Sequence, residues 1–176
     1  MKAVRIEVRD LECNARDQRY AKVARSHLRV PVYGTETVQI FWLKAADGAE
    51  LPAAEVKSWA ERVFCDPVLQ EYALGHQGEF RFSGAGSVYP SFVTQVRYLP
   101  GVTDNVGRTA TEALSLLSPF AREHGVQVFT GKAVYFYGDL TKGEAEKVSG
   151  EAIANPLNEE IQLYPWAEYF SQSRFE

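Results

Sequence analysis

The sequence of 176 residues has only two cysteines, no long apolar run and no excess of basic side chains. Cys13 and Cys65 are too few for a disulfide framework and do not have the spacing of zinc ligands. No apolar segment approaches the roughly 20 residues that span a bilayer, and the first residues lack the apolar core of a signal peptide. We therefore expect a cytoplasmic protein with reduced thiols and no membrane partner.

The charge is nearly balanced, with 19 Lys and Arg against 23 Asp and Glu. Neither half of the chain carries the basic stripe that follows a nucleic-acid backbone, so no nucleic acid is expected as a partner. An apolar content of 45% and a charged content of 24% are typical of a globular protein with a substantial core.

The most informative stretch lies in the second half of the chain. Alternating apolar residues over 92–99 predict a strand. The Pro100-Gly101 pair ends it, because proline lacks a backbone donor and glycine adopts angles closed to other residues. Thr103 or Asp104 can cap the helix expected over 104–121, along which apolar residues keep helical spacing.

The start of this helix has two interpretations. Free backbone amides at a helix start can bind an anion such as phosphate, and Arg108 would lie one turn inside the helix. The glycines, however, match neither a Walker A loop nor a dinucleotide-binding spacing. An ordinary helix cap is the better interpretation.

Periodicity elsewhere predicts an α+β chain. The first strand, over 3–9, places Arg5, Glu7 and Arg9 on one face, which its alternation predicts to be solvated. Further strands are expected at 36–44, 79–82, 126–137 and 161–166, and further helices at 14–28, 52–64 and 142–154.

The order β-α-β-α-β occurs twice at a nearly constant offset. Asn14 lies 90 residues before Asp104, and Asp66-Pro67 lies 89 residues before Asn155-Pro156. This indicates an internal duplication. We expect a first unit at 1–84, a linker at 83–88 and a second unit at 88–176. The units would pack as an intramolecular pseudo-dimer of mixed sheets, with helices on one face.

The sequence contains no convincing catalytic or metal-binding constellation. The three histidines have no metal-ligand spacing, and no Gly-x-Ser-x-Gly motif is present. Glu159 and Glu160 are adjacent on a predicted strand, so their side chains should point to opposite faces. The aromatic tail over 164–170 could form an interface or pack on the core. We expect no catalytic residue, metal or cofactor in this chain.

Leu99 to Ala110 resembles the PurS family and the PurS-like N-terminal region of some fused PurL proteins. These belong to phosphoribosylformylglycinamidine synthase, an amidotransferase of purine synthesis. The resemblance covers nearly the whole chain as two copies. The residues of the second copy that match the family pattern are Pro100, Gly101, Val102, Asp104 and Gly107, and later Ala154, Asn155, Pro156 and Glu160.

The first copy departs from this pattern at its turn. Asp10 to Asn14 stands where Pro-Gly-Val-x-Asp would be, and Asp17 replaces the family glycine. The end of the second helix of this copy, at Asp66-Pro67, resembles the family pattern well.

The resemblance implies a scaffold that is not catalytic alone, within an enzyme that forms a C–N bond. It would bridge a PurL-type synthetase and a PurQ-type glutaminase and support ammonia transfer, with self-association left open. ATP and Mg²⁺ would bind the synthetase partner. The interface candidates are Pro100, Gly101, Val102, Asp104, Gly107, Arg108, Asn155, Pro156, Glu160, Asp66 and Pro67.

The alternative is a small-molecule-sensing regulatory module, because duplicated units of this size can hold a ligand at their mutual interface. An independent enzyme ranks third.

Overall fold

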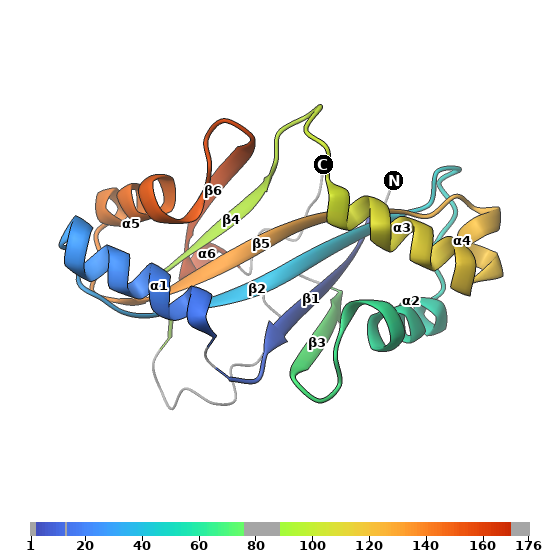
Figure 1. The fold of residues 1–176 in the computed structure, drawn as a ribbon, viewed down its shortest axis with the longest axis horizontal. Coiled ribbons are helices and arrows are strands. Elements are labelled where there is room, and N and C mark those ends of the chain that lie inside the picture. Colours follow the sequence, from blue (N-terminus) through green and yellow to red (C-terminus); the bar gives the residue numbers. More distant parts are fainter. Residues whose placement is uncertain (1–2, 13, 76–88, 170–176) are drawn as a thin grey trace.

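The computed structural model describes residues 3–12, 14–75 and 89–169 (Figure 1). Six strands form one sheet in the order β3-β1-β2-β5-β4-β6. The strands are β1 (Val4–Asp10), β2 (Val32–Lys44), β3 (Gln70–Gly75), β4 (Phe92–Tyr98), β5 (Gln127–Gly138) and β6 (Glu159–Pro165). The helices are α1 (Ala15–Val23), α2 (Ala53–Trp59), α3 (Asn105–Leu117), α4 (Pro119–Glu123), α5 (Lys142–Val148) and α6 (Trp166–Tyr169). Helices α1, α2 and α5 continue into π-helical turns at Ala24–Leu28, Ala60–Phe64 and Ser149–Ile153.

The sheet corrects our expectation of mixed sheets, because every strand pair between the described residues is antiparallel. The reason lies in the direction of α1. Figure 1 shows α1 running away from the end of β1, and residues 15–28 span about 21 Å at roughly 1.5 Å per residue. The first six residues of β2 bring it back by about 20 Å, before residues 38–43 pair with β1.

The two halves of the chain have the same strand arrangement. The order β3-β1-β2 in the first half mirrors β6-β4-β5 in the second, and β2 pairs with β5 at the centre. The central pairing runs from Val32 opposite Gly138 to Lys44 opposite Gln127. The chain is therefore an α+β protein built on one continuous sheet. The expected linker at 83–88 and strand at 79–82 lie outside the described residues.

The helices of each half pack partly on strands of the other half. In one cluster, Tyr20 and Ala24 from the α1 segment pack with Val134 of β5 and Val148 of α5. In the other, Leu114 of α3 packs with α2 and with β1 and β2. Figure 1 shows the result, with α1 beside α5 at one end and α3 and α4 beside α2 at the other. Because each cluster contains residues from both halves, this packing holds the two halves together.

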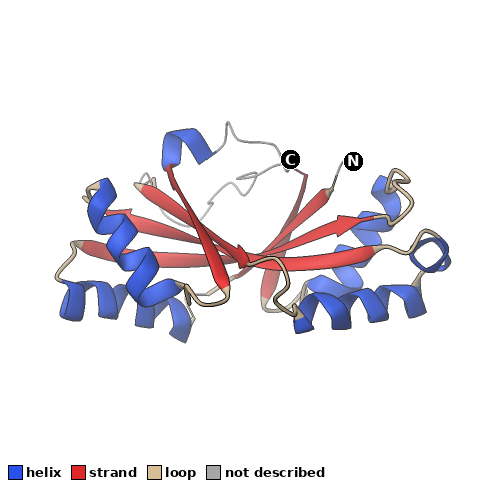
Figure 2. Cartoon of the chain, turned by 90° about the horizontal axis from the view of Figure 1, so that it is seen from above, coloured by secondary structure: helices blue, strands red, loops and turns tan. Residues whose placement is uncertain are grey.

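The longer helices cover one face of the sheet, as expected, and we call it the helix face. The short α6 lies on the opposite face (Figure 2). There Tyr169 is fully buried and packs edge-on against Tyr135, with ring centroids 5.8 Å apart. The described part of the aromatic tail therefore packs on the core.

The single helix expected over 104–121 is divided into α3 and α4 at Ser118. Proline disfavours the helical conformation in the residue before it, and Pro119 follows Ser118 directly. The Ser118 hydroxyl then caps α4 by accepting from the Ala121 amide at 3.2 Å. None of the helices in the described ranges has the length and apolarity needed to cross a membrane.

Replacing Leu114 with alanine should lower the free energy of unfolding by about 3 kcal/mol, because this fully buried side chain fills the core between α3 and the first-half strands. Chemical denaturation monitored by circular dichroism measures the change. Leu116→Ala is the matched control, since Leu116 is on the same helix and 84% exposed. Two separate unfolding transitions in Leu114→Ala would contradict the proposed coupling of the halves.

Candidate functional site

The β4–α3 turn contains most of the residues that resemble the family motif. Gly101 has a φ of +87°, a conformation that strongly favours glycine, and no neighbouring atom lies within 4 Å of the position of a Cβ. The expected need for glycine at this turn is therefore confirmed, and it comes from the backbone angle and not from crowding. The Val102 amide closes the turn by donating to the Leu99 carbonyl at 3.1 Å.

Asp104, and not Thr103, caps α3. Its Oδ1 accepts from the Gly107 amide at 2.7 Å and from the Thr130 hydroxyl at 2.9 Å, and its Oδ2 accepts from the Thr130 amide at 2.6 Å. The carboxylate thus joins the start of α3 to β5. Because this carboxylate occupies the helix start, the ordinary-cap interpretation is the one that the geometry favours.

Gly107 permits this close approach of α3 to β5. A Cβ at this position would lie 2.5 Å from both the Val128 carbonyl oxygen and Asp104 Oδ2. In the first half, where Asp17 occupies the corresponding position, Asn14 caps α1 through the Asp17 amide at 2.9 Å. The buried Asp17 carboxyl instead accepts from the Thr37 hydroxyl on β2, and burial raises its pKa.

An open pocket of about 380 Å³ lies beside the β4–α3 turn, and we call it the motif pocket. It gathers five of the residues predicted from the sequence, from a turn and from an edge strand. They are Pro100, Gly101, Val102, Asp104 and Glu160. The other lining residues are Trp42, Arg97, Tyr98, Leu99, Phe129 and Thr130.

The motif pocket contains an ion pair and two aromatic rings. The Arg97 guanidinium donates to both oxygens of Glu160, at 3.0 and 3.2 Å, and this lowers the pKa of the Glu160 carboxyl. Trp42 is buried, whereas Phe129, its partner across β2 and β5, is 48% exposed. Gly131 leaves room for the Trp42 ring, since a Cβ there would approach it to 2.7 Å.

The first half repeats the ion pair on the other outer strands. Arg9 on β1 pairs with Glu71 on β3, as Arg97 on β4 pairs with Glu160 on β6. Arg9 also contacts Glu36 at 3.1 Å. Strand register places each arginine directly opposite its glutamate.

The two proline turns also have matching geometry. The Asp66 side chain accepts from the Val68 amide at 2.9 Å, and the Asn155 side chain accepts from the Leu157 amide at 3.1 Å. Each turn leads into an edge strand. The predicted residues Asp66, Pro67, Asn155 and Pro156 do not line the motif pocket. Arg108 is exposed in the first turn of α3 and is likewise outside it.

The prediction that Arg5, Glu7 and Arg9 face solvent was wrong. All three are at most 7% exposed. Arg5 donates to Glu7 at 2.7 Å, to Gln95 of β4 at 3.0 Å and to the Tyr169 hydroxyl at 2.7 Å. Burial raises the pKa of Tyr169 to about 12. Alternation alone cannot reveal this network, because α6 comes from the far end of the sequence.

Comparisons with family models and with curated proteins test whether the chain belongs to a known family. No family model and no curated protein matches the chain. Within residues 3–12, 14–75 and 89–169, no group of three or more His, Cys, Asp or Glu side chains could hold a metal ion.

Gly107→Ala should destabilise the protein by about 2 kcal/mol, in the range for overpacking a close contact, because backbone and the capping carboxylate block the new methyl group. Thermal and denaturant unfolding measure the effect. The control is Gly143→Ala in α5, where a Cβ meets no atom within 4 Å and alanine favours the helix. Equal stability of the two variants would show that the approach of α3 to β5 is not tight.

Arg97→Gln should raise the pKa of Glu160 toward its ordinary value of about 4.3, because the charged donor is lost. Carboxyl titration by nuclear magnetic resonance measures this. The lowered pKa stabilises the folded chain above the ordinary value, and the contribution disappears as the pH falls through the folded-state pKa. Glu160 is 37% exposed, so solvent screening keeps this contribution below about 1 kcal/mol.

Lys57→Gln is the control for that titration, because among the described residues Lys57 pairs only with the exposed Glu61, at 4.0 Å. It should leave the Glu160 titration unchanged. An unchanged Glu160 titration in Arg97→Gln would contradict the role assigned to the ion pair.

Proposed function

We propose that this chain is a non-catalytic scaffold module of phosphoribosylformylglycinamidine synthase in purine nucleotide biosynthesis. It bridges a PurL-type synthetase and a PurQ-type glutaminase and supports ammonia transfer between them. The observation that carries the proposal is the gathering of the family-like residues of the turn with Glu160 in one exposed pocket. A role in purine synthesis would make the chain cytoplasmic.

The polar groups of the motif pocket favour a binding surface over a reaction centre. Asp104 accepts from Gly107 and Thr130, and Glu160 accepts from Nε and Nη2 of Arg97. Both carboxylates are therefore engaged by hydrogen-bond donors of the chain itself. Both have the geometry of groups that shape a surface.

The accessible part of the pocket is a turn beside an aromatic ring. Phe129 is 48% exposed, and Pro100 and Gly101 are exposed at its rim. Partly exposed aromatic side chains next to rigid turns are typical anchors of protein interfaces. We infer that Phe129 contacts the synthetase partner. ATP and Mg²⁺ would be held by that partner.

The matching halves support an internal duplication as the origin of the scaffold. Equivalent features include the strand order, the two arginine–glutamate pairs and the two proline turns. One backbone bond is also repeated: Leu11 donates to Leu69 and Leu99 donates to Asn158, both at 2.9 Å. A pseudo-dimer of this kind offers two related but unequal surfaces, which suits a protein that bridges two different partners.

Reconstitution tests the proposal. The chain is mixed with a PurL-type synthetase and a PurQ-type glutaminase, and glutamine-dependent formation of the amidine is measured together with complex formation. Addition of the chain should raise the glutamine-dependent rate while leaving the ammonia-dependent rate of the synthetase nearly unchanged. No binding and no stimulation with partners from the same source would refute the proposal.

Phe129→Ser should weaken complex formation at least tenfold, because the loss of an interface anchor typically exceeds the 1.4 kcal/mol that corresponds to a factor of ten. Tyr33→Ser is the matched control, since Tyr33 is an exposed aromatic on β2 that does not line the motif pocket. If both variants bind as the unchanged chain does, the contact surface lies elsewhere.

A further inference from the structure

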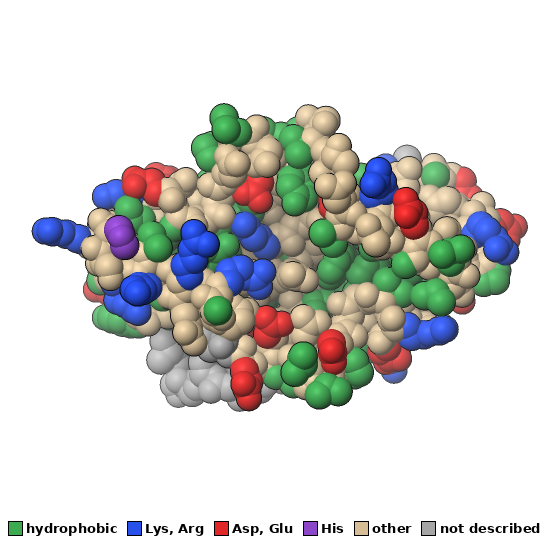
Figure 3. Space-filling view, viewed as in Figure 1, with side chains coloured by type: hydrophobic (Ala, Val, Ile, Leu, Met, Phe, Trp, Pro, Cys, Tyr) green, Lys and Arg blue, Asp and Glu red, His purple; other side chains and the backbone are tan. Residues whose placement is uncertain are grey.

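A second cavity lies on the helix face, and we call it the central groove. It is open, has a volume of about 200 Å³ and is formed between the start of α1 and the start of α3, over β2 and β5. Figure 3 shows a hollow in the middle of this face, with Lys and Arg side chains gathered on one side of it. The residues used below are Arg16, Gln39, Thr130, Lys132 and Glu159.

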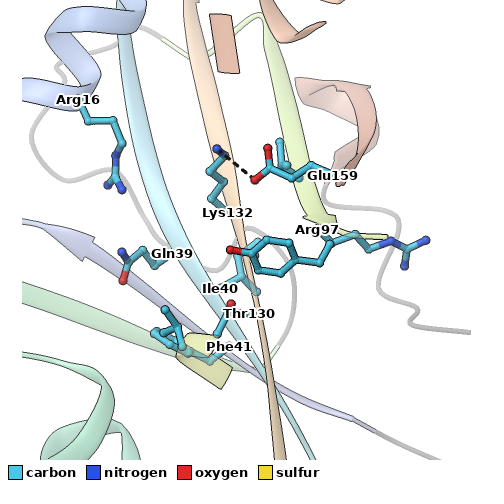
Figure 4. A pocket seen from close by; sticks show the side chains of 12 residues that line it. Arg16, Gln39, Ile40, Phe41, Arg97, Thr130, Lys132 and Glu159 are labelled. Carbon is cyan, nitrogen blue, oxygen red and sulfur yellow. Dashed lines mark ion pairs between the residues drawn. The ribbon is translucent and has the colours of Figure 1, made fainter. Parts of the chain in front are cut away.

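Strand register explains why these polar groups meet. Gln39 of β2 lies directly opposite Lys132 of β5. Thr130 is two residues before Lys132 and so points to the same face. Arg16 reaches the groove from α1, and Figure 4 shows its guanidinium extending toward the strands beside Gln39. Two halves of the chain therefore contribute donors to one small space.

Arg16 has hydrogen-bonding capacity that the described residues do not use. Its Nε is shielded from solvent and has no hydrogen-bond partner among them. A shielded donor of a charged guanidinium without an acceptor costs free energy, which a bound acceptor would recover. The free donor thus favours a ligand with oxygen acceptors.

Lys132 is only partly neutralised within the chain. Its Nζ donates to the Ile153 carbonyl at 2.9 Å and lies 3.8 Å from Glu159. That separation is too long for a hydrogen bond, although the charges still attract. The ammonium has three donors and can therefore bind another acceptor from the groove.

The charged side chains that line the groove are three cations, Arg16, Arg97 and Lys132, and one carboxylate, Glu159. Glu159 attracts Lys132, and the buried Asp17 next to Arg16 attracts the Arg16 guanidinium. Figure 4 shows the Arg97 side chain extending away from Lys132 and Glu159. Its guanidinium pairs with Glu160 at 3.0 Å. The nearby Asp104 carboxylate accepts from the Gly107 amide and from the hydroxyl of Thr130, which lines the groove. A negative group on a ligand would accept hydrogen bonds from the donors of Arg16 and Lys132 that the described residues leave unused.

We propose that the central groove binds a small oxyanion, a carboxylate or phosphate group, through Arg16, Lys132 and Gln39. The guanidinium of Arg16 provides a planar pair of donors that suits either group. The cavity is smaller than the roughly 300–1,000 Å³ of sites for drug-sized ligands, so the ligand is a small molecule or one end of a larger one. This site goes beyond the proposed scaffold role and gives the sequence-level alternative of a sensing module a specific location.

Calorimetric titration of the full chain tests the site. Inorganic phosphate and acetate are titrated separately at constant ionic strength in chloride. We expect saturable binding of at least one anion at a stoichiometry of one per chain. Binding of phosphate alone identifies a phosphate site, and binding of acetate alone identifies a carboxylate site. Absence of saturable binding of both anions overturns the proposal.

Arg16→Gln should weaken this binding by about tenfold or more, as expected for the loss of a charge-assisted hydrogen bond. Arg19→Gln is the matched control, because Arg19 is an exposed arginine on the same helix and does not line the groove. Equal loss in both variants would indicate attraction by general surface charge and would overturn the assignment.

A second variant, Gln39→Leu, keeps the test independent of charge and should also weaken binding. Thermal unfolding of all three variants establishes that they are folded. Failure of the anion site can be distinguished from failure of the scaffold proposal. Phe129→Ser should bind the anion normally. Arg16→Gln should still form the complex with the synthetase. Normal anion binding by both Arg16→Gln and Gln39→Leu would place the anion elsewhere.

Discussion

The antiparallel pairing of β2 with β5 is the interaction on which the rest of the structure depends. These strands are the longest in the sheet and pair from Val32 opposite Gly138 to Lys44 opposite Gln127. Each half alone would have three strands and an open edge along its longest strand, with helices extending beyond the sheet that they cover. Pairing closes both edges and gives each helix pair a surface contributed by both halves.

The same pairing builds both candidate sites. Trp42 and Phe129 are register partners on the two central strands, and the motif pocket lies where they meet the turn after β4. Gln39 and Lys132 are also register partners, and they form the floor of the central groove on the other face. A shift of one residue in this register would exchange the faces of both sets of side chains. The two cavities also adjoin each other, because Arg97, Tyr98 and Thr130 line both.

Several local features could be predicted from the sequence because they depend on neighbours in the chain. Gly101 adopts the backbone angle that its turn requires, and Asp104 caps the helix that begins at the next residue. The break at Ser118 was missed, although Pro119 provided a signal for it. The antiparallel direction of all the strand pairs was also not predicted, because the length of a helix does not show in which direction it runs over the sheet.

Periodicity, caps and turn residues by themselves determined an α+β chain with a repeated β-α-β-α-β order, because these patterns act over a few residues. Only the tertiary structure decided that one antiparallel sheet joins the halves and that Arg5 is buried beneath Tyr169. It also decided that Glu160 joins the turn of Pro100 in one pocket. These outcomes depend on contacts between residues distant in the sequence, whose free energies no local pattern contains.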